Sequence, residues 1–523
     1  MTHVGFWSAA KAHPDRIAVV DPEGGTLTFR ELQERANQLV HALREMGLQR
    51  GDGIAILLPN CAEFIVSVLA AGQAGLYYTP LNHNLIASEI AYILDNSDAK
   101  AFIAHERFGD KANAAVEEAN LPALNTLAVG EIDGFADFTS VIDCQPTTAP
   151  EDRAAGSMMS YTSGTTGRPK GVRRTLSGMS PECQDKLTAP MNMLAVFGLG
   201  QAGRNAHLCV SPLYHNAPGG YAMFALQLGH TLILTAKFDA EQFLALVEKH
   251  RITSTQMVPI QFYRLLKLPE STRKKYDVSS LRVISHAGAP CPADVKRRMM
   301  DWFGPVVYEY YSSGEGVGGT LVTPSEALER PGTVGRPFLP GAVIKVLDEA
   351  GNEVPRGEVG AVYSTLPGGG SSFKYHKDES KSASARRGDL FTAGDYGRMD
   401  EDGYLYLVSR RTDLILSGGV NIYPAEVETV LLEHQGIADA AVFGIPNEEW
   451  GEEVKAVVQL GVGVTASPDL ADEIQKFCRE RLAAFKVPKS VDFMDELPRD
   501  PNGKMYKRHL RDPYWVKATA GAR

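Results

Sequence analysis

The most informative stretch of this chain is Tyr161-Thr-Ser-Gly-Thr-Thr-Gly-Arg-Pro-Lys170-Gly171, which holds three glycines, four serine or threonine hydroxyls and a lysine. Glycines let a backbone turn tightly and bring its N–H groups close to an anion. Hydroxyls donate hydrogen bonds and the lysine adds a positive charge. The pattern predicts a phosphate-binding loop, although its spacing differs from the Walker A motif. A flexible Gly/Ser linker is the alternative, but linkers rarely carry Pro-Lys-Gly between apolar segments.

Helices and strands alternate on the N-terminal side of this loop. Thr28 and Glu31 form a capping box, so a helix is expected to follow them. The apolar residues of one face of that helix are Leu32, Ala36, Leu39, Val40 and Leu43. A buried strand is expected at Ile54–Leu58, and Asn60 is expected to cap a second helix that ends near Gly75. This alternation predicts a parallel sheet covered by helices.

A second series of strands follows the loop, and the pattern then becomes richer in β-structure. The expected strands are His207–Val210, Thr231–Leu234, Leu281–Ser285, Val306–Tyr308, Val343–Leu347 and Val359–Tyr363. The charged, Ser-rich stretch Lys377–Arg387 is expected to be exposed. We place a domain boundary near residue 410, with domains at 1–409 and 410–523. The second is expected to be a small α+β unit with helices from Pro424 and near Asp469–Leu482, and strands at Ala440–Phe443 and Val454–Leu460.

Composition restricts the class of protein. The chain has 523 residues, a formal net charge of -10 and 44% hydrophobic residues, which argues against disorder and against binding to nucleic acid. Its six cysteines never form a Cys-x-x-Cys pair, which argues against a zinc site or a disulfide scaffold. No signal peptide and no apolar run of about 18 residues is visible. A cytoplasmic protein without a transmembrane segment is therefore expected.

Six further segments that contain candidate functional residues are distributed over nearly the whole chain. They are Pro212-Leu-Tyr-His215, Gly288-Ala-Pro290, Glu309-Tyr-Tyr-Ser-Ser-Gly-Glu315, Thr392-Ala-Gly-Asp395, Ser409-Arg-Arg-Thr-Asp-Leu-Ile-Leu-Ser-Gly-Gly-Val-Asn421 and Pro498-Arg-Asp-Pro-Asn-Gly-Lys504. Together with the phosphate loop they resemble the adenylate-forming superfamily, in its acyl-CoA synthetase or fatty-acyl-CoA ligase branch. The resemblance implies an α/β fold: a large N-terminal domain of helix-covered parallel sheets with a β-rich subdomain, and a small mobile α+β C-terminal domain.

The same resemblance assigns roles to residues. Catalytic roles fall to Lys504, Glu315 and His215. Residues expected to bind ATP or AMP are Thr162, Ser163, Gly164, Thr165, Thr166, Gly167, Lys170, Gly288, Ala289, Pro290, Glu309, Tyr310, Tyr311, Ser312, Asp395 and Arg410. The acyl pocket is expected to contain Tyr214, His215, Gly219, Gly288, Ser313 and Gly316. Gly418 and Gly419 would contact CoA, Thr412 would be the hinge, and Glu315 with Thr162 would bind magnesium.

Elementary chemistry agrees with several of these roles. The Asp395 carboxylate can accept hydrogen bonds from two ribose hydroxyls at once. Glu315 offers the hard oxygen ligand that Mg²⁺ prefers. Lys504 would stabilise the negative charge that spreads over the phosphoryl oxygens during adenylation. Taken singly, each residue could also be an ordinary turn former or a surface charge.

The sequence departs from the family pattern at three positions. Gly314 replaces the usual threonine of the magnesium segment, so Ser312 or Ser313 would have to supply the missing phosphate contact. Thr412 stands where the hinge often has aspartate or lysine, and Ser409 replaces a glycine. A hinge needs only a soft backbone dihedral, so domain motion is still expected.

The segment at Tyr214-His215 lacks the aspartate with which amino-acid-activating relatives hold an ammonium group. A carboxylic acid without an α-amino group is therefore expected. The acyl pocket is expected to be roomy because of its many glycines, which are Gly219, Gly220, Gly316, Gly318 and Gly319. The expected ligands are ATP, Mg²⁺, CoA and a long or bulky apolar acid, such as a fatty, steroid side-chain or terpenoid acid. Alternatives are a carrier protein as acceptor, a luciferase-like oxygenase and a non-catalytic nucleotide-binding protein; a homodimer also stays open.

Overall fold

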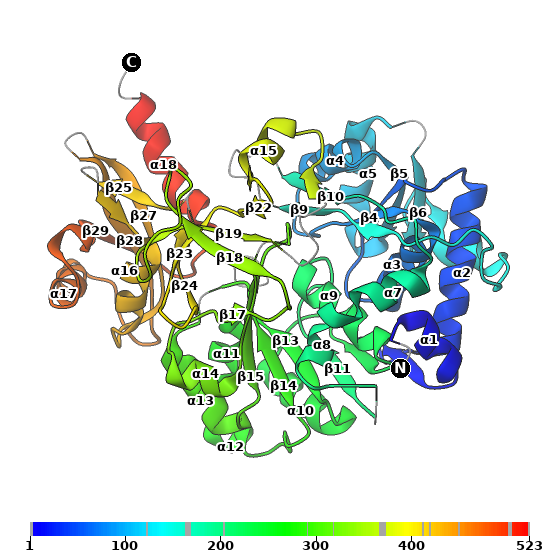
Figure 1. Ribbon diagram of the computed structural model, residues 1–523, viewed down its shortest axis with the longest axis horizontal. Coiled ribbons are helices and arrows are strands. Elements are labelled where there is room, and N and C mark those ends of the chain that lie inside the picture. The colour runs from blue at the N-terminus through cyan, green and yellow to red at the C-terminus, as the bar shows by residue number, and fades with distance from the viewer. Residues whose placement is uncertain are drawn as a thin grey trace.

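The computed structural model describes most of the chain. Outside the described residues lie 1–3, 122–123, 163–168, 202–203, 290, 317, 366–372, 411–412, 418–419, 448–449, 500–504 and 521–523. In Figure 1 the chain runs from the N-terminal helix α1 (Phe6–Ala12) at one end of the long axis to the C-terminal helix α18 (Lys507–Ala520) near the other.

The first large sheet has six parallel strands in the order β7-β6-β5-β3-β4-β8. These strands are β3 (Gly53–Leu57), β4 (Tyr77–Pro80), β5 (Ala99–His105), β6 (Asn125–Val129), β7 (Ala136–Asp137) and β8 (Ser157–Met158). The helices of this region are α2 (Phe29–Glu45), α3 (Ala62–Ala74), α4 (Ala87–Asn96), α5 (Gly109–Ala119) and α6 (Phe138–Asp143). All five residues of β3 are buried, as expected for a strand covered on both faces.

The second large sheet has nine strands in the order β17-β16-β15-β14-β13-β11-β12-β1-β2, and its central strands are parallel. The strands are β1 (Ile17–Val20), β2 (Thr26–Thr28), β11 (Ala206–Cys209), β12 (Thr231–Leu234), β13 (Ser254–Met257), β14 (Val283–His286), β15 (Val307–Ser312), β16 (Gly318–Val322) and β17 (Arg336–Pro337). The helices are α7 (Pro181–Thr188), α8 (Met193–Val196), α9 (Asn216–Gln227), α10 (Ala240–His250), α11 (Pro259–Leu266), α12 (Glu270–Arg273), α13 (Ala293–Phe303) and α14 (Pro324–Glu329).

Two smaller antiparallel sheets complete the N-terminal part. One joins β9 (Ser160–Thr162), β10 (Lys170–Arg174) and β20 (Phe373–Tyr375), and helix α15 (Glu379–Ser384) follows β20. The other contains β18 (Val343–Leu347), β19 (Gly360–Thr365), β21 (Arg386–Arg387), β22 (Leu390–Phe391), β23 (Asp395–Met399) and β24 (Leu405–Arg410). The expected β-rich region is therefore present.

The C-terminal part has its own five-stranded sheet and its own apolar core. Its strands are β25 (Ile415–Ser417), β26 (Val420–Ile422), β27 (Ile437–Asn447), β28 (Gly451–Leu460) and β29 (Ser490–Met494). Its other helices are α16 (Pro424–Leu432) and α17 (Pro468–Arg479). The expected α+β organisation is confirmed, and Figure 1 shows this unit at one end of the molecule.

Local expectations are confirmed at α2 and wrong at α3. Thr28 and Glu31 form the capping box of α2. At α3 the N-cap is Cys61, because the Asn60 side chain is used elsewhere: its amide donates to the carbonyl oxygens of Ser211 and Thr235 at 3.0 Å. Asn60 thus ties the two large sheets together.

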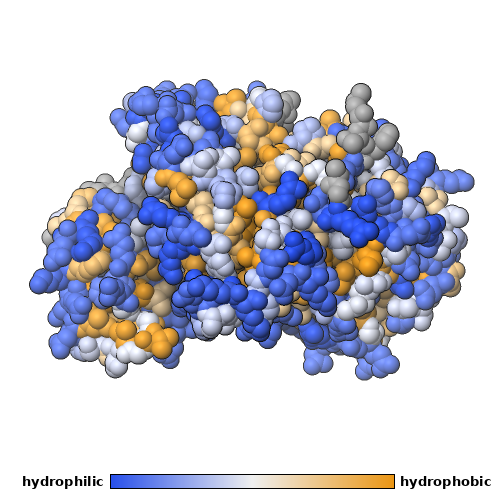
Figure 2. All heavy atoms as spheres, turned by 90° about the horizontal axis from the view of Figure 1, so that it is seen from below, coloured by the Kyte–Doolittle hydropathy of each residue, from blue (hydrophilic) through white to orange (hydrophobic). Residues whose placement is uncertain are grey.

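The surface seen in Figure 2 is mainly hydrophilic, with apolar side chains scattered between charged ones. Among the described residues, no helix is both long enough and apolar enough to cross a membrane.

Candidate active site

The predicted phosphate loop connects two strands of a hairpin. Lys170 in β10 pairs with Thr162 in β9, so residues 163–169 join their ends. Ser163, Gly164, Thr165, Thr166 and Gly167 lie outside the described residues, as does the Thr162 side chain. The Lys170 ammonium lies 3.1 Å from the Asp378 carboxylate, and its side chain is only 15% exposed.

Strand β20 and helix α15 bring two unforeseen side chains to this site. β20 pairs with β10, and Tyr375 lies opposite Val172. The Tyr375 hydroxyl donates to Oε1 of Glu315 at 3.0 Å, and Asp378 contacts Lys170 from the start of α15. The expectation of an exposed stretch from Lys377 was therefore incomplete: Lys377 is exposed, but the Asp378 side chain is only 31% exposed.

Glu315 lies just beyond β15 and is only 7% exposed. One guanidinium nitrogen of Arg174 donates to the carbonyl oxygen of Gly314 at 3.1 Å, which places a cation close to this carboxylate. Burial lowers the pKa of Arg174, and the nearby charge of Glu315 opposes that change. A single buried carboxylate suits Mg²⁺, which takes one or two protein carboxylates and completes its shell with phosphate and water oxygens. In the described part of the chain, no group of three or more His, Cys, Asp or Glu side chains could hold a metal by itself.

Asp395 lies at the start of β23 and is 5% exposed. The Tyr311 hydroxyl donates to its Oδ2 at 2.7 Å, so the expected ribose turn meets the segment that ends in Glu315. In the β23–β24 ladder Asp395 lies opposite Arg410, whose side chain is not among those described. Sequence reasoning singled out all three residues but could not foresee the bond between Tyr311 and Asp395.

The two residues before Tyr311 face the core. Lys296 lies 2.6 Å from Oε2 of the Glu309 carboxylate, and both side chains are almost fully buried. Burial raises the pKa of Glu309, and Lys296 opposes that rise. Tyr310 packs against Tyr221 with ring centroids 5.7 Å apart, and burial raises its pKa. The Glu309 carboxylate is therefore engaged with Lys296, and Tyr311 is the tyrosine that contacts Asp395.

Aromatic rings gather around the expected acyl-binding residues. The ring centroids of Tyr214 and His215 are 4.2 Å apart, and His83 meets Tyr214 edge-on at 4.9 Å. The Asn84 amide donates to the Tyr214 hydroxyl at 3.3 Å. Burial, with the charges of Lys111 and Arg107, lowers the pKa of His83 to about 4, so His83 is neutral near pH 7. Neither His83 nor Asn84 carries a sequence signal that would have identified it.

The glycines expected to enlarge the acyl pocket mostly have backbone reasons. A Cβ at Gly219 would lie 2.5 Å from the carbonyl oxygen of Leu213. Gly316, Gly318 and Gly319 have φ angles of +81°, +97° and +93°, which L side chains rarely adopt. Gly220 differs from these four: it has no positive φ angle, and a Cβ added to it would have no described heavy atom within 4 Å. These glycines therefore give little information about pocket volume.

The remaining described candidates lie at strand ends. Gly288, with φ +86°, and Ala289 follow β14, whereas Pro290 lies outside the described residues. Ser312 is the last residue of β15. Ser313 begins the following turn, and its carbonyl oxygen accepts a hydrogen bond from the N–H of Gly316 at 2.9 Å.

Thr412, Gly418, Gly419 and Lys504 also lie outside the described residues. The last described residue before Lys504 is Arg499, whose guanidinium donates to the Asp439 carboxylate at 2.6 Å. Both Asp439 and Arg499 act electrostatically on Tyr263 of α11, whose pKa is raised mainly by burial. Asp439 and Arg499 of the C-terminal part thus lie near Tyr263 of α11.

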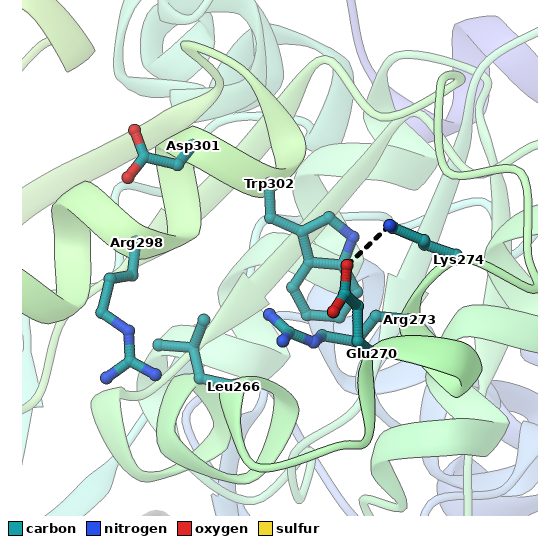
Figure 3. Close-up of a pocket in the computed structure, with 7 residues that line it drawn as sticks. All are labelled: Leu266, Glu270, Arg273, Lys274, Arg298, Asp301 and Trp302. Carbon is teal, nitrogen blue, oxygen red and sulfur yellow. Dashed lines mark ion pairs between the residues drawn. The ribbon is translucent and has the colours of Figure 1, made fainter.

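A separate pocket of about 360 Å³ lies at the ends of α11, α12 and α13 (Figure 3). It is lined by Leu266, Glu270, Arg273, Lys274, Arg298, Asp301 and Trp302. Glu270 and Lys274 form an ion pair at 2.6 Å, and the Arg273 guanidinium lies 5.4 Å from the centroid of the Trp302 ring. None of the residues expected in the active site lines this pocket.

Comparisons with known proteins agree with this arrangement. The family model described as AMP-binding enzyme matches residues 6–370, and the model described as AMP-binding enzyme C-terminal domain matches residues 426–504. A feruloyl-CoA synthase of an Amycolatopsis species is 34% identical, over 97% of this chain and 98% of that protein. A 3-(7a-methyl-1,5-dioxo-octahydroinden-4-yl)propanoyl:CoA ligase of Rhodococcus jostii is 31% identical, over 96% and 97%. The solved structure of o-succinylbenzoate CoA synthetase from Bacillus subtilis, in complex with its acyl-adenylate intermediate, has a TM-score of 0.80 and 27% identity, over 97% of each chain.

Proposed function

The chain belongs to the AMP-binding enzyme family, in its acyl-CoA ligase branch, and we propose that its substrate is a long or bulky apolar carboxylic acid. The protein is an AMP-forming acid–thiol ligase. The acid and ATP give an acyl-adenylate and pyrophosphate, and the CoA thiol then displaces AMP. We also propose that the protein acts in the cytoplasm, which suits its six free cysteines.

The observation that supports the first half-reaction best is that neighbouring elements bring four polar side chains into two contacts. Lys170 ends the phosphate loop, Glu315 follows β15, and β20 with α15 contacts both of them through Asp378 and Tyr375. We propose that Lys170 and the loop hydroxyls bind the β- and γ-phosphates. When Mg²⁺ is bound by Glu315 with Thr162, its charge offsets that of the phosphates. The substrate carboxylate is itself the nucleophile, so no protein nucleophile is required.

The nucleoside would be bound on the other side of Glu315. The buried Asp395 carboxylate would accept hydrogen bonds from the ribose hydroxyls, with Arg410 donating to the same sugar. Tyr311, whose hydroxyl donates to Asp395, would present its ring to adenine, and Gly288 and Ala289 would contact the same base. Ser312 or Ser313 would donate to phosphate in place of the threonine that Gly314 replaces.

The C-terminal domain would serve both half-reactions. Lys504 would stabilise charge on the α-phosphate and the carboxylate during adenylation. Rotation about the hinge near Thr412 would then withdraw Lys504 and bring Gly418 and Gly419 to the adenylate. Glycines there would let pantetheine pass close to the backbone. The domain limits 1–409 and 410–523 belong to this proposal.

The acid class is supported by chemistry around Tyr214. Tyr214, His215 and the neutral His83 form an aromatic wall, and Asn84 reaches the Tyr214 hydroxyl. The segment at Tyr214-His215 has no carboxylate to hold a substrate ammonium. Relatives named for feruloyl and fused-ring propanoyl substrates are consistent with a bulky acid.

A substrate panel tests the acid class directly. AMP release would be measured with acetate, benzoate, cinnamates, fused-ring propanoates and fatty acids of increasing length, each at several concentrations. We expect the highest kcat/KM for a bulky ring acid or a long fatty acid. Activation of acetate alone, or of small aryl acids alone, would refute the proposed acid class while leaving the ligase reaction intact.

A further inference from the structure

We propose that Asp378 is an internal anion that competes with the phosphates of ATP and with pyrophosphate for Lys170. This inference rests on the phosphate role proposed above for Lys170. It adds a residue that the loop motif does not contain and assigns it a function: weakening nucleotide affinity so that pyrophosphate can leave.

The Asp378 carboxylate is held rigidly in place. One of its oxygens, Oδ1, accepts from the backbone N–H of Lys381 at 3.0 Å and from the Ser380 hydroxyl at 3.3 Å, which caps the first turn of α15. The other oxygen, Oδ2, faces the Lys170 ammonium at 3.1 Å. The backbone bond from Lys381 is the main favourable cause of a lowered pKa for Asp378, so this carboxylate is ionised at neutral pH.

Lys170 is the flexible partner of this pair. It ends the loop on a long side chain, whereas Asp378 is fixed by the helix cap. An ammonium has three N–H donors on a rotatable stem and can exchange one anion for another without backbone movement. Because the pair is partly buried, with side-chain exposures of 15% and 31%, water screens it less than a surface pair.

Electrostatics gives the direction of the effect. Triphosphate brings several negative charges toward a lysine that already has a carboxylate partner. Binding must therefore replace or share an existing ion pair, and the carboxylate itself repels the phosphates. After adenylation, the same carboxylate can recapture Lys170 as pyrophosphate departs. Asp378 should thus lower affinity for both MgATP and magnesium pyrophosphate.

The substitution Asp378→Asn isolates the charge from the fold. Asparagine is as good an N-cap as aspartate, so the bond to the Lys381 N–H can persist while the negative charge is lost. Glu379→Gln removes the same charge one position later, at an exposed residue that also lies in the first turn of α15, and is the matched control.

Calorimetric titration of the full chain with MgATP, and separately with magnesium pyrophosphate, tests the proposal without knowledge of the acid. We expect Asp378→Asn to lower both dissociation constants by roughly two- to fivefold, the range of a partly exposed ion pair. Glu379→Gln should change neither by as much. In a Lys170→Ala background, Asp378→Asn should lose most of its effect, because the group for which it competes is gone.

Three outcomes would overturn the inference. Weaker binding in Asp378→Asn would mean that the carboxylate positions Lys170 for phosphate and does not compete for it. An equal gain in the Lys170→Ala background would show that the charge acts without Lys170. Unchanged affinity in Lys170→Ala alone would remove the premise, while AMP release by that variant with acid and CoA would show that the ligase function stands.

Discussion

Lys296 and Glu309 form a buried ion pair in the core beneath the strand that carries Tyr311. Their side chains are 3% and 7% exposed and their charged atoms are 2.6 Å apart. The His286 ring lies 3.8 Å from the Glu309 carboxylate. Burial lowers the pKa of His286 well below its usual value, so this ring is uncharged. Such a pair is costly to break, since removal of one partner leaves the other charged and desolvated.

We predict that Lys296→Met lowers the stability of the protein by about 3–5 kcal/mol at neutral pH. Burial already raises the pKa of Glu309, and loss of Lys296 would raise it further. The folded variant would then hold a proton more tightly than the unfolded chain, whose glutamate has a pKa of about 4.3. Its stability should consequently recover as the pH falls toward that value.

The thermal unfolding midpoint measured between pH 8 and pH 5 checks this prediction. Lys274→Met is the matched control, because its pair with Glu270 is exposed and exposed ion pairs contribute little to stability. A deficit that is the same at every pH would contradict an uncompensated Glu309 charge as its cause.

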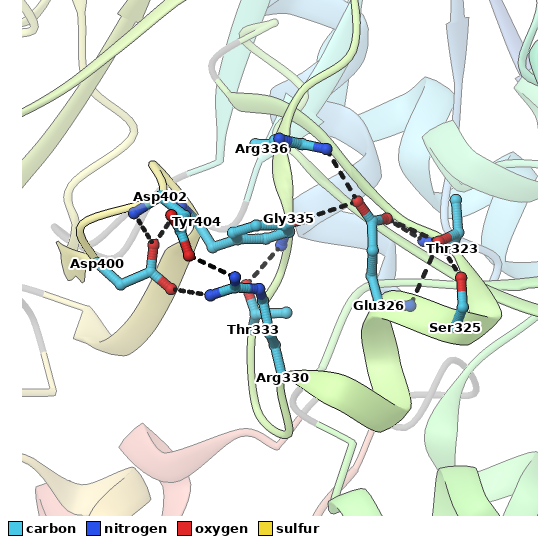
Figure 4. A network of polar contacts seen from close by, with 10 residues as sticks. All are labelled: Thr323, Ser325, Glu326, Arg330, Thr333, Gly335, Arg336, Asp400, Asp402 and Tyr404. Atoms are coloured by element: carbon cyan, nitrogen blue, oxygen red, sulfur yellow. Dashed lines mark hydrogen bonds and ion pairs between the residues drawn. The ribbon is translucent and has the colours of Figure 1, made fainter.

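The β23–β24 hairpin carries Asp395 and Arg410 opposite each other at its open end. A polar network fastens its turn to α14 and to the segment that follows α14 (Figure 4). Arg330 at the end of α14 bonds Asp400 at 3.0 Å and also Asp402, and it covers the Tyr404 ring at 4.4 Å. The Tyr404 hydroxyl donates to Glu326 at 2.7 Å. The hairpin is therefore braced at its turn, far along the strands from Asp395.

We predict that Arg330→Leu raises the KM for ATP more than it lowers kcat. Loss of two ion pairs and a cation–π contact should loosen the hairpin and with it the position of Asp395. Steady-state kinetics at saturating acid and CoA would measure the change. Arg398→Leu on the same hairpin, which loses a contact with the Tyr406 ring, should behave like the unchanged protein. Equal effects of the two substitutions would contradict a role for the braced turn.

Sequence patterns predicted local structure well and long-range contacts poorly. The capping box at Thr28 and the apolar face that follows it depend only on neighbouring residues, and both are confirmed. The prediction that Asn60 caps α3 was wrong because its side chain binds the distant backbone of Ser211. Strand β13 was missed because its residues Ser254-Thr-Gln-Met257 are largely polar, although all four are buried.

The same limit applies within the site. Motifs identified Lys170, Glu315 and Asp395, but not the contacts that Asp378, Tyr375 and Tyr311 make with them. Tyr375 and Glu315 are 60 positions apart in the sequence, and Tyr311 and Asp395 are 84 positions apart. Only the folded chain brings such residues together. The glycine count gives little information about pocket volume, because residues such as Gly318 have a positive φ angle that by itself favours glycine.

The two domains are proposed to move relative to each other, and we predict that Lys504→Ala separates the two half-reactions. Adenylation should fall by at least about 100-fold, because a positioned charge in the transition state is lost. Thioester formation from supplied acyl-adenylate and CoA should be nearly unchanged, since Lys504 would be withdrawn by then. The two rates would be measured separately on the same preparations.

Lys476→Ala, at an exposed position of α17 in the same domain, is the control and should affect neither half-reaction. Equal loss of both half-reactions in Lys504→Ala would refute the proposed alternation of the C-terminal domain.

This chain joins an acid to CoA through an acyl-adenylate. The most direct test measures AMP release from ATP over a panel of carboxylic acids, with and without CoA, and identifies the products by mass spectrometry. We predict AMP and an acyl-CoA in equal amounts, formed only when both the acid and CoA are supplied. Acyl-adenylate without any thioester would contradict CoA as acceptor and point to a carrier protein, and no turnover on a broad panel would contradict the ligase activity itself.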